Sequence, residues 1–374
     1  MRGYKMNLQS DVTVTREYGG YLPLELPKGQ EYYRGEHVVA LNSGRYAIVY
    51  ALLDGGWERI YLPCYLCRTV ETAIRRLAPH VDICYYHIDR QFLPMNVYPK
   101  ERECILWVNY FGIQPETVID QMTEIYKGHL ILDHTQSFFS VPRDHVYQVY
   151  SCRKFFGVCD GSYVIGEGIR KRPLEQHYSS AYFAHLIQSH EHGTNHAYRL
   201  NKENEMRLNN CGMGLMSSLT RAILKGTDYF SVRDRRLANM KTLHGILGPY
   251  NELQIQALTP AMNYPFLCPD RSLRERLVAS RIYVPQLWRE TAENEASSQW
   301  EKYLSEHLCL LPVDQRYGEA DMYTIGQTVL ELIKEEQAVY ETQFYYTMLS
   351  ERTYDPAGDR RDRVQDEGTA GVCL

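Results

Sequence analysis

The sequence predicts an α/β fold, with a mostly parallel sheet in a large domain and a smaller α+β domain after it. Between residues 36 and 165, short apolar runs alternate with segments of helical periodicity. This alternation is typical of doubly wound parallel sheets. The chain also has 374 residues, whereas single cores rarely grow beyond roughly 250–300 residues. We therefore expect two cores.

The strands are expected where short apolar runs stop at turn residues. These runs cover residues 38–41, 60–62, 81–85, 104–108, 129–132 and 146–150. Helical spacing of apolar residues predicts helices over 47–52, which Gly55-Gly56 ends, and over 70–77.

The pattern changes after residue 165. A polar, histidine-rich stretch over 177–205 is expected to be a mobile loop, and 213–247 is expected to form long helices. The predicted organisation has an N-terminal segment, a large domain, a small C-terminal domain and a frayed polar tail, which cover 1–35, 36–250, 251–350 and 351–374.

Composition excludes several classes of protein. Lys and Arg number 41 against 46 Asp and Glu, a net charge of -5, whereas nucleic-acid and anionic-membrane binding favour a basic face. No apolar run is long enough to span a bilayer, and the N-terminus lacks the apolar region of a secretory signal. We expect a cytoplasmic protein whose ten cysteines stay reduced.

Ligands of open α/β sheets bind at the carboxyl ends of the strands. The turn from Asn42 to Arg45 could bind a phosphate at a helix start, or Ser43 could simply cap the helix. Asp133 ends an apolar strand and could hold a cationic ring nitrogen or cap a helix. Lys154, among Phe155 and its apolar neighbours, could be a nucleophile with a lowered pKa or a surface lysine in a turn.

Two further patterns are ambiguous. Cys64 and Cys67 form a CxxC pair, but a zinc site normally needs a second pair. A redox role is possible at a helix start, yet small buried cysteines are the favoured interpretation. The histidines, at 177, 185, 190, 192 and 196, follow no metal-binding spacing, so no metal is expected.

Seven motifs in order, from about residue 36 to 335, resemble the DegT/DnrJ/EryC1/StrS family of sugar aminotransferases. They are LNSGRYAIVYAL, YLPCYLC, VNYFG, LILDHTQSFF, YSCRKFFGVCDGSYV, NNCGMGLMSSLT and LPVDQRYGEADM. The resemblance implies an aspartate-aminotransferase-like fold, which is fold type I of the pyridoxal-phosphate (PLP) enzymes.

The resemblance implies catalytic roles for two residues. Lys154 would form the covalent Schiff base with pyridoxal 5′-phosphate, and Asp133 would keep the pyridine nitrogen of the cofactor protonated. The remaining cofactor contacts that it implies are those of Ser43, Gly44, Arg45, Tyr65, Gln136, Ser151 and Asn210.

Some of these assignments depart from the family pattern. Tyr65 would stack on the cofactor ring, with Cys67 as the rival alignment. Arg45 stands where many members have Thr in the phosphate turn. Asn210 matches an asparagine that reaches the phosphate of the neighbouring subunit in homodimers, but Cys211 stands where the family often has an aromatic residue.

The implied activity is amino transfer, with glutamate as donor, to a nucleotide-linked keto-deoxy-sugar for surface polysaccharide or glycoconjugate biosynthesis. The active site would lie at the interface of a homodimer. Two alternatives stay open. One is a PLP-dependent sugar dehydratase, although members with that activity replace the Schiff-base lysine by His. The other is a non-catalytic member that serves as a binding or assembly module.

Overall fold

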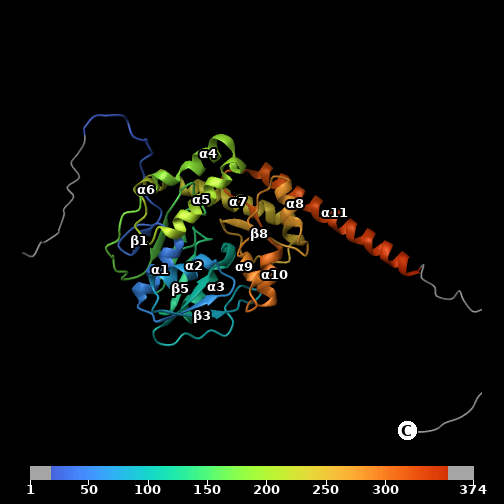
Figure 1. Ribbon diagram of the computed structural model, residues 1–374, viewed down its shortest axis with the longest axis horizontal. Helices are drawn as coiled ribbons and strands as arrows, with labels where there is room; N and C mark the ends of the chain where they lie inside the picture. Colours follow the sequence, from blue (N-terminus) through green and yellow to red (C-terminus); the bar gives the residue numbers. More distant parts are fainter. Residues whose placement is uncertain (1–17, 353–374) are drawn as a thin grey trace, which may run out of the picture.

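A seven-stranded sheet forms the body of the computed structural model, which describes residues 18–352 (Figure 1). The strand order is β1-β7-β6-β5-β4-β2-β3. β2, β3, β4, β5 and β6 pair in parallel, whereas β7 pairs antiparallel with both β1 and β6. The mostly parallel sheet is thus confirmed. The strands are β1 Val38–Leu41, β2 Arg59–Pro63, β3 Asp82–Tyr86, β4 Glu103–Val108, β5 Leu130–His134, β6 Tyr147–Ser151 and β7 Ser162–Ile165.

Six of these strands coincide with the predicted apolar runs to within two residues. The seventh, β7, was missed by the sequence analysis because only four residues separate Gly161 from Gly166. β7 hydrogen-bonds to the strand that ends at Ser151. The chain therefore turns back directly after the Lys154 loop, which fixes both ends of that loop to the sheet.

Helices cover the sheet. α1 (Gly44–Gly55) is almost wholly buried, and Gly56 ends it in the left-handed conformation with φ of 69°, which glycine adopts without strain. α1 packs against β5, β6 and β7 and against α2. The other helices of this part are α2 Arg68–Leu77, α3 Glu116–Ile125 and the 3₁₀ turn η1 Tyr110–Gly112.

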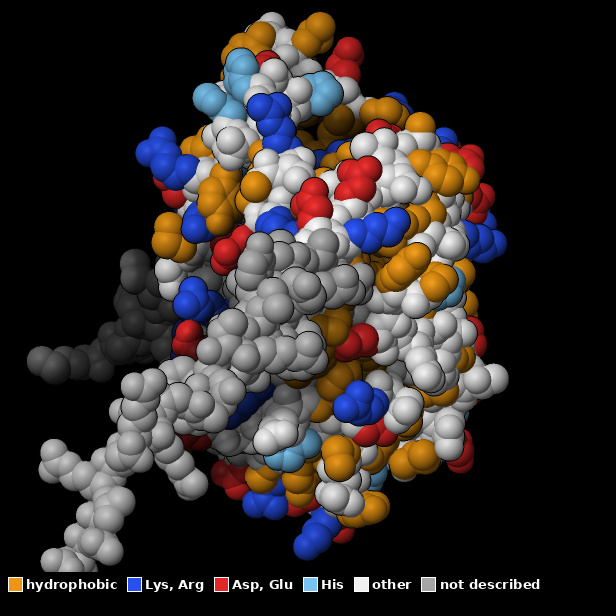
Figure 2. Space-filling model, turned by 90° about the vertical axis from the view of Figure 1, so that its right-hand side faces the viewer, with side chains coloured by type: hydrophobic (Ala, Val, Ile, Leu, Met, Phe, Trp, Pro, Cys, Tyr) orange, Lys and Arg blue, Asp and Glu red, His pale blue; other side chains and the backbone are white. Residues whose placement is uncertain are grey.

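The histidine-rich stretch is not a loop. After the 3₁₀ turn η2 (Ser180–Tyr182), it forms the helices α4 (Ala184–His192) and α5 (Thr194–Asn210), which pack against each other at the top of Figure 1. The prediction of a mobile loop was therefore wrong. The two helices form a hairpin that buries only His185, Ala197, Asn204 and Leu208. Because the remaining residues are mostly polar, the sequence shows little apolar periodicity that would indicate a helix. Pale-blue histidine side chains gather on this projection in Figure 2.

The C-terminal part contains a separate two-stranded antiparallel sheet of β8 (Asn263–Leu267) and β9 (Leu308–Pro312). Helices surround it (Figure 1), and its buried side chains, such as Tyr264 and Leu311, belong to the same hydrophobic cluster as Trp107 of β4. The predicted long helices over 213–247 are α6 Ser218–Lys225 and α7 Tyr229–Leu247, and the remaining elements are η3 Gly248–Tyr250, α8 Leu273–Ala279, α9 Arg289–Glu293, α10 Gln299–His307 and α11 Glu319–Arg352.

Two expectations concern absences. No disulfide joins any of the nine cysteines within residues 18–352. None of the helices described here is both long and apolar enough to cross a bilayer. The predicted polar tail lies outside the described residues from 353 onward.

The last residue of β5, His134, lies in the core. Its ring stacks on Tyr150 with 5.2 Å between centroids, and its Nδ1 lies 2.9 Å from Ser137 Oγ. Its Nε2 is buried and has no hydrogen-bond partner in the described part of the chain. Burial lowers the pKa of His134 to about 3, so the ring is neutral in the folded protein at neutral pH.

This buried ring predicts a loss of stability in mild acid. The unfolded chain takes up a proton near pH 6.5, whereas folded His134 takes it up only near pH 3. Stability is thus present above pH 6.5 and falls as the pH drops toward 3. Between pH 7 and pH 5 the contribution amounts to about 2 kcal/mol.

Urea unfolding of wild type and His134→Asn at the two pH values measures this effect. We expect the wild type to lose about 2 kcal/mol more than the variant. Equal losses in the two proteins would show that His134 does not couple folding to protonation.

Candidate active site

A cavity of about 210 Å³ opens at the carboxyl ends of the strands. Most of the predicted site residues line it together, namely Ser43, Gly44, Arg45, Asp133, Gln136, Ser151 and Lys154. Their convergence follows from the topology. β5 and β6 are adjacent and parallel, so the residues at their ends, Asp133 and Ser151, reach the same edge of the sheet.

The start of α1 forms one wall of the cavity. Ser43 precedes the helix, yet its side chain makes no capping hydrogen bond, so its hydroxyl remains available on the cavity wall. Gly44 approaches the neighbouring wall closely: a Cβ at this position would lie 3.1 Å from Thr135 Cγ2. A larger residue would therefore require the Thr135 side chain to shift by a few tenths of an ångström. The first N–H groups of the helix, which lack partners within it, remain close to the cavity.

Thr135 connects the two residues with predicted catalytic roles. Its backbone N–H donates to Asp133 Oδ1 at 2.8 Å, and its Oγ1 accepts from Lys154 Nζ at 2.9 Å. Burial raises the pKa of Asp133, which the positive charge of Lys154 partly opposes.

Burial lowers the pKa of Lys154, and the negative charge of Asp133 opposes this shift. Lys154 is exposed at the mouth of the cavity, where a bound molecule could reach its amine.

Two arginines add positive charge to this wall. Arg153 and Arg45 both pair with Glu205 of α5, the second pair at 3.8 Å. Arg45 Nη1 and Arg153 Nε are buried and have no hydrogen-bond partner among the described residues. Burial lowers the pKa of Arg153 to about 10 and also lowers the pKa of Arg45. Two guanidinium groups thus share one carboxylate, so some of their N–H groups remain free to bind an anion.

Gln136, which also lines the cavity, stabilises the backbone beside it through a hydrogen bond. Its Oε1 accepts the backbone N–H of Phe111 at 2.8 Å. Phe111 has a positive φ of 57°, a conformation that costs a residue with a bulky side chain free energy. Gln136 therefore holds a strained turn beside the cavity while its own side chain contributes to the wall.

Two predicted residues lie away from the cavity. Tyr65 is fully buried in the core, where its ring stacks with Tyr110 and meets Trp288 edge to face. Cys67, the residue of the rival alignment, lines the cavity instead. Asn210 ends α5 and is exposed in a different, shallow cleft.

Several residues of the cavity were not predicted from the sequence. Thr135 and Arg153 stand beside the predicted Asp133 and Lys154, so adjacency could have drawn attention to them. Trp288 lines the cavity from the C-terminal part, and no local sequence signal pointed to it. Glu205 lies in the histidine-rich stretch, where the loop prediction concealed its position on a helix face.

Comparison with known proteins gives a fold and no sequence relative. The sequence matches no protein-family model and no curated protein. Solved structures do match. One is a DegT DnrJ EryC1 StrS aminotransferase from Brucella abortus, at 15% identity and a TM-score of 0.50, over 79% of this chain and 86% of that one.

Two further matches have higher TM-scores. PseC of Helicobacter pylori, an aminotransferase involved in the biosynthesis of pseudoaminic acid, has 12% identity and a TM-score of 0.53, over 80% of this chain and 87% of that one. The E. coli GDP-4-keto-6-deoxy-D-mannose-3-dehydratase with bound hydrated PLP has 12% identity and a TM-score of 0.54, over 79% and 87%.

The chain shares the fold of these enzymes. These neighbours are thus two aminotransferases, one of them bearing the name of the family that the motifs resemble, and a dehydratase, and the expected fold type I is confirmed. At such low sequence identity, the similarity shows the fold alone.

Proposed function

We propose that this chain is a PLP-dependent aminotransferase that moves an amino group from glutamate to a nucleotide-linked keto-deoxy-sugar. One observation carries the proposal: Lys154 and Asp133 line a single cavity and are joined through Thr135. An amine and a buried carboxylate at the strand ends are the two groups that this cofactor needs at its aldehyde and at its ring nitrogen.

The donor set of the cavity fits pyridoxal phosphate at both ends. Burial raises the pKa of Asp133, and a protonated ring nitrogen beside it would stabilise its charged form once Lys154 is engaged by the cofactor. The unpartnered guanidinium donors of Arg45 and Arg153, together with Ser43 and Ser151, suit a phosphate. When bound, the cofactor would supply an electron sink for cleavage of a substrate C–H bond.

The residues of the chain would then perform distinct tasks. Lys154 would hold the cofactor covalently through Nζ, and once released by the substrate amine, that same Nζ would accept and return the proton of the substrate carbon. Its lowered pKa favours the neutral amine that both steps require. Thr135 would orient Lys154 through their hydrogen bond.

The proposal also covers the substrate class, the oligomeric state and the cellular location. The nucleotide-sugar substrate is supported by the structural neighbour named for a GDP-linked keto-deoxy-sugar, and the proposal includes a role in surface polysaccharide or glycoconjugate synthesis in the cytoplasm. Lys154 favours amino transfer over dehydration. A homodimer is also proposed, since Asn210 is exposed at the end of α5, and the same helices expose Ile187, Tyr198 and Met206.

Replacement of Lys154 tests the covalent link. Lys154→Ala should remove the visible absorption that wild type acquires with pyridoxal phosphate, because no amine remains to react with the aldehyde. Lys154→Arg, which keeps the positive charge near Asp133, should lose the band as well. A variant that still formed a borohydride-reducible adduct in this cavity would exclude Lys154 as the attachment point.

Replacement of Asp133 tests the electron sink. Asp133→Asn should still bind the cofactor, but it should lose at least roughly 100-fold in the rate at which glutamate bleaches the visible band, since a neutral amide no longer stabilises the ring cation. Stopped-flow absorbance measures this half reaction, and Asp82→Asn, an exposed change on β3, is the control. An unchanged rate would contradict the assignment.

The two arginines can be tested through the phosphate alone. Arg153→Ala should weaken binding of pyridoxal phosphate by roughly 10- to 100-fold, the cost of one charge-assisted contact. Binding of pyridoxal, which lacks the phosphate, should change little. Tryptophan fluorescence measures both affinities, and Arg233→Ala, an exposed arginine of α7, is the control. Equal losses for the two compounds would rule out a phosphate role.

A further inference from the structure

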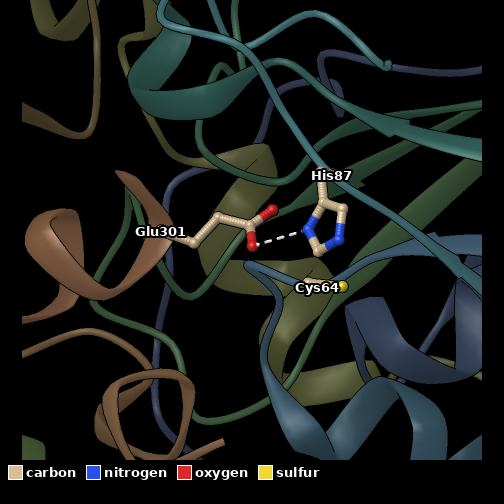
Figure 3. A group of neighbouring side chains, drawn as sticks. All are labelled: Cys64, His87 and Glu301. Carbon is tan, nitrogen blue, oxygen red and sulfur yellow. Dashed lines mark hydrogen bonds and ion pairs between the residues drawn. The ribbon is translucent and has the colours of Figure 1, made fainter. Parts of the chain in front are cut away.

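Three side chains outside the cofactor cavity converge from distant segments: Cys64, His87 and Glu301. Cys64 follows β2, His87 follows the adjacent β3, and Glu301 lies in the first turn of α10. Their potential ligand atoms all lie within 4.8 Å of one another. Figure 3 shows His87 and Glu301 facing each other, with Cys64 directly beside the imidazole ring.

The carboxylate of Glu301 is held rigidly. Glu301 is fully buried, and its oxygens accept the backbone N–H groups of Ile88 at 3.1 Å and of Ser298 at 2.8 Å. The remaining partner is His87 Nδ1 at 3.0 Å. A buried carboxylate requires positive charge beside it, and a half-exposed histidine supplies that charge only when protonated.

The third member of the cluster, Cys64, adds a soft ligand. Burial and the nearby Glu301 raise the pKa of its thiol to about 11, so the thiol is neutral unless a cation binds. A set of one sulfur, one imidazole nitrogen and one carboxylate oxygen suits zinc, whereas calcium and magnesium prefer oxygen ligands alone.

We propose that Cys64, His87 and Glu301 bind one zinc ion, which joins α10 to the ends of β2 and β3. The bonds would form to Cys64 Sγ, to His87 Nδ1 and to a Glu301 oxygen, with water in the fourth position. Binding would release the thiol proton to solvent. This proposal is independent of the proposed aminotransferase function.

The surroundings meet the further requirements of a metal site. Two ligand atoms of a tetrahedral zinc lie roughly 3.3–3.6 Å apart. The widest separation in the cluster would therefore close by up to roughly 1 Å, whereas His87 Nδ1 and the Glu301 oxygen, now 3.0 Å apart, would move slightly apart. The backbone N–H groups on Glu301 are the outer hydrogen bonds that orient a metal-binding carboxylate. A cleft of about 530 Å³, lined by Cys64, Cys67 and Glu290 among others, gives an ion access from solvent.

Small buried cysteines, rather than a zinc site, were the favoured interpretation of the CxxC pair, because the sequence has no second such pair. The structure provides different partners for Cys64. His87 and Glu301 are 214 residues apart in the chain, and neither stands in a recognisable metal motif. Only the packing of α10 against the strand ends brings them together.

Zinc binding to the full-length protein tests this site. After treatment with a chelator, wild type should bind one equivalent of zinc with micromolar affinity or better in calorimetry. Cobalt in its place should give the near-ultraviolet band of a cobalt–thiolate bond. Cys64→Ser should abolish this band and weaken zinc binding at least 10-fold, because serine offers no thiolate.

Matched variants separate this site from others. Cys84→Ser, a cysteine of β3 outside the cluster, and Cys67→Ser should both retain zinc. Loss of zinc in Cys67→Ser would indicate a CxxC site and overturn the proposal, as would equal binding in Cys64→Ser or no stoichiometric zinc in wild type. Glu301→Gln has one amide oxygen in place of the two oxygens that accept the backbone N–H groups of Ile88 and Ser298, so its metal-free melting temperature should fall, and it should also lose the rise that zinc produces in wild type.

Discussion

A buried carboxylate at the end of β5 is the constraint around which the cofactor cavity is built. Asp133 is almost fully removed from solvent, and the cost of burying its charge raises its pKa. The chain offsets this cost with a backbone N–H from Thr135 and with the positive Lys154 nearby. Both compensating groups come from strand ends at one edge, so the parallel sheet and the charge balance of the cavity depend on each other.

The sheet and much of the cavity could be predicted from the sequence because both depend on local signals. Apolar runs of three to five residues identified the parallel strands, and the residues after them included Asp133 and Lys154. Features that depend on packing between distant segments of the chain could not be predicted from the sequence. Tyr65 carries an aromatic ring suited to stacking, but its neighbour Tyr110 holds it in the core through a hydrogen bond to its backbone carbonyl.

The histidine-rich hairpin illustrates a second limit. Its composition is that of a loop, yet the side chains that decide its structure are few and widely spaced, such as Ala197 and Leu208 on α5. The same helix carries Glu205, the shared partner of Arg45 and Arg153. Part of the charge balance of the cavity thus comes from a segment whose polarity concealed its structure.

The C-terminal part contributes to the cavity and to the Cys64 cluster through neighbouring segments. Trp288 lines the cavity and contacts Tyr65, while Glu301, one helix further along, reaches Cys64 and His87. Tyr65 directly follows Cys64. The turn after β2 therefore contacts Trp288 through Tyr65 and supplies Cys64 to the cluster. An ion that fixed α10 to this turn would therefore also restrain the segment that carries Trp288, because α9 and α10 pack against each other. The position of that cavity wall would then depend on a carboxylate that is itself buried and in need of positive charge.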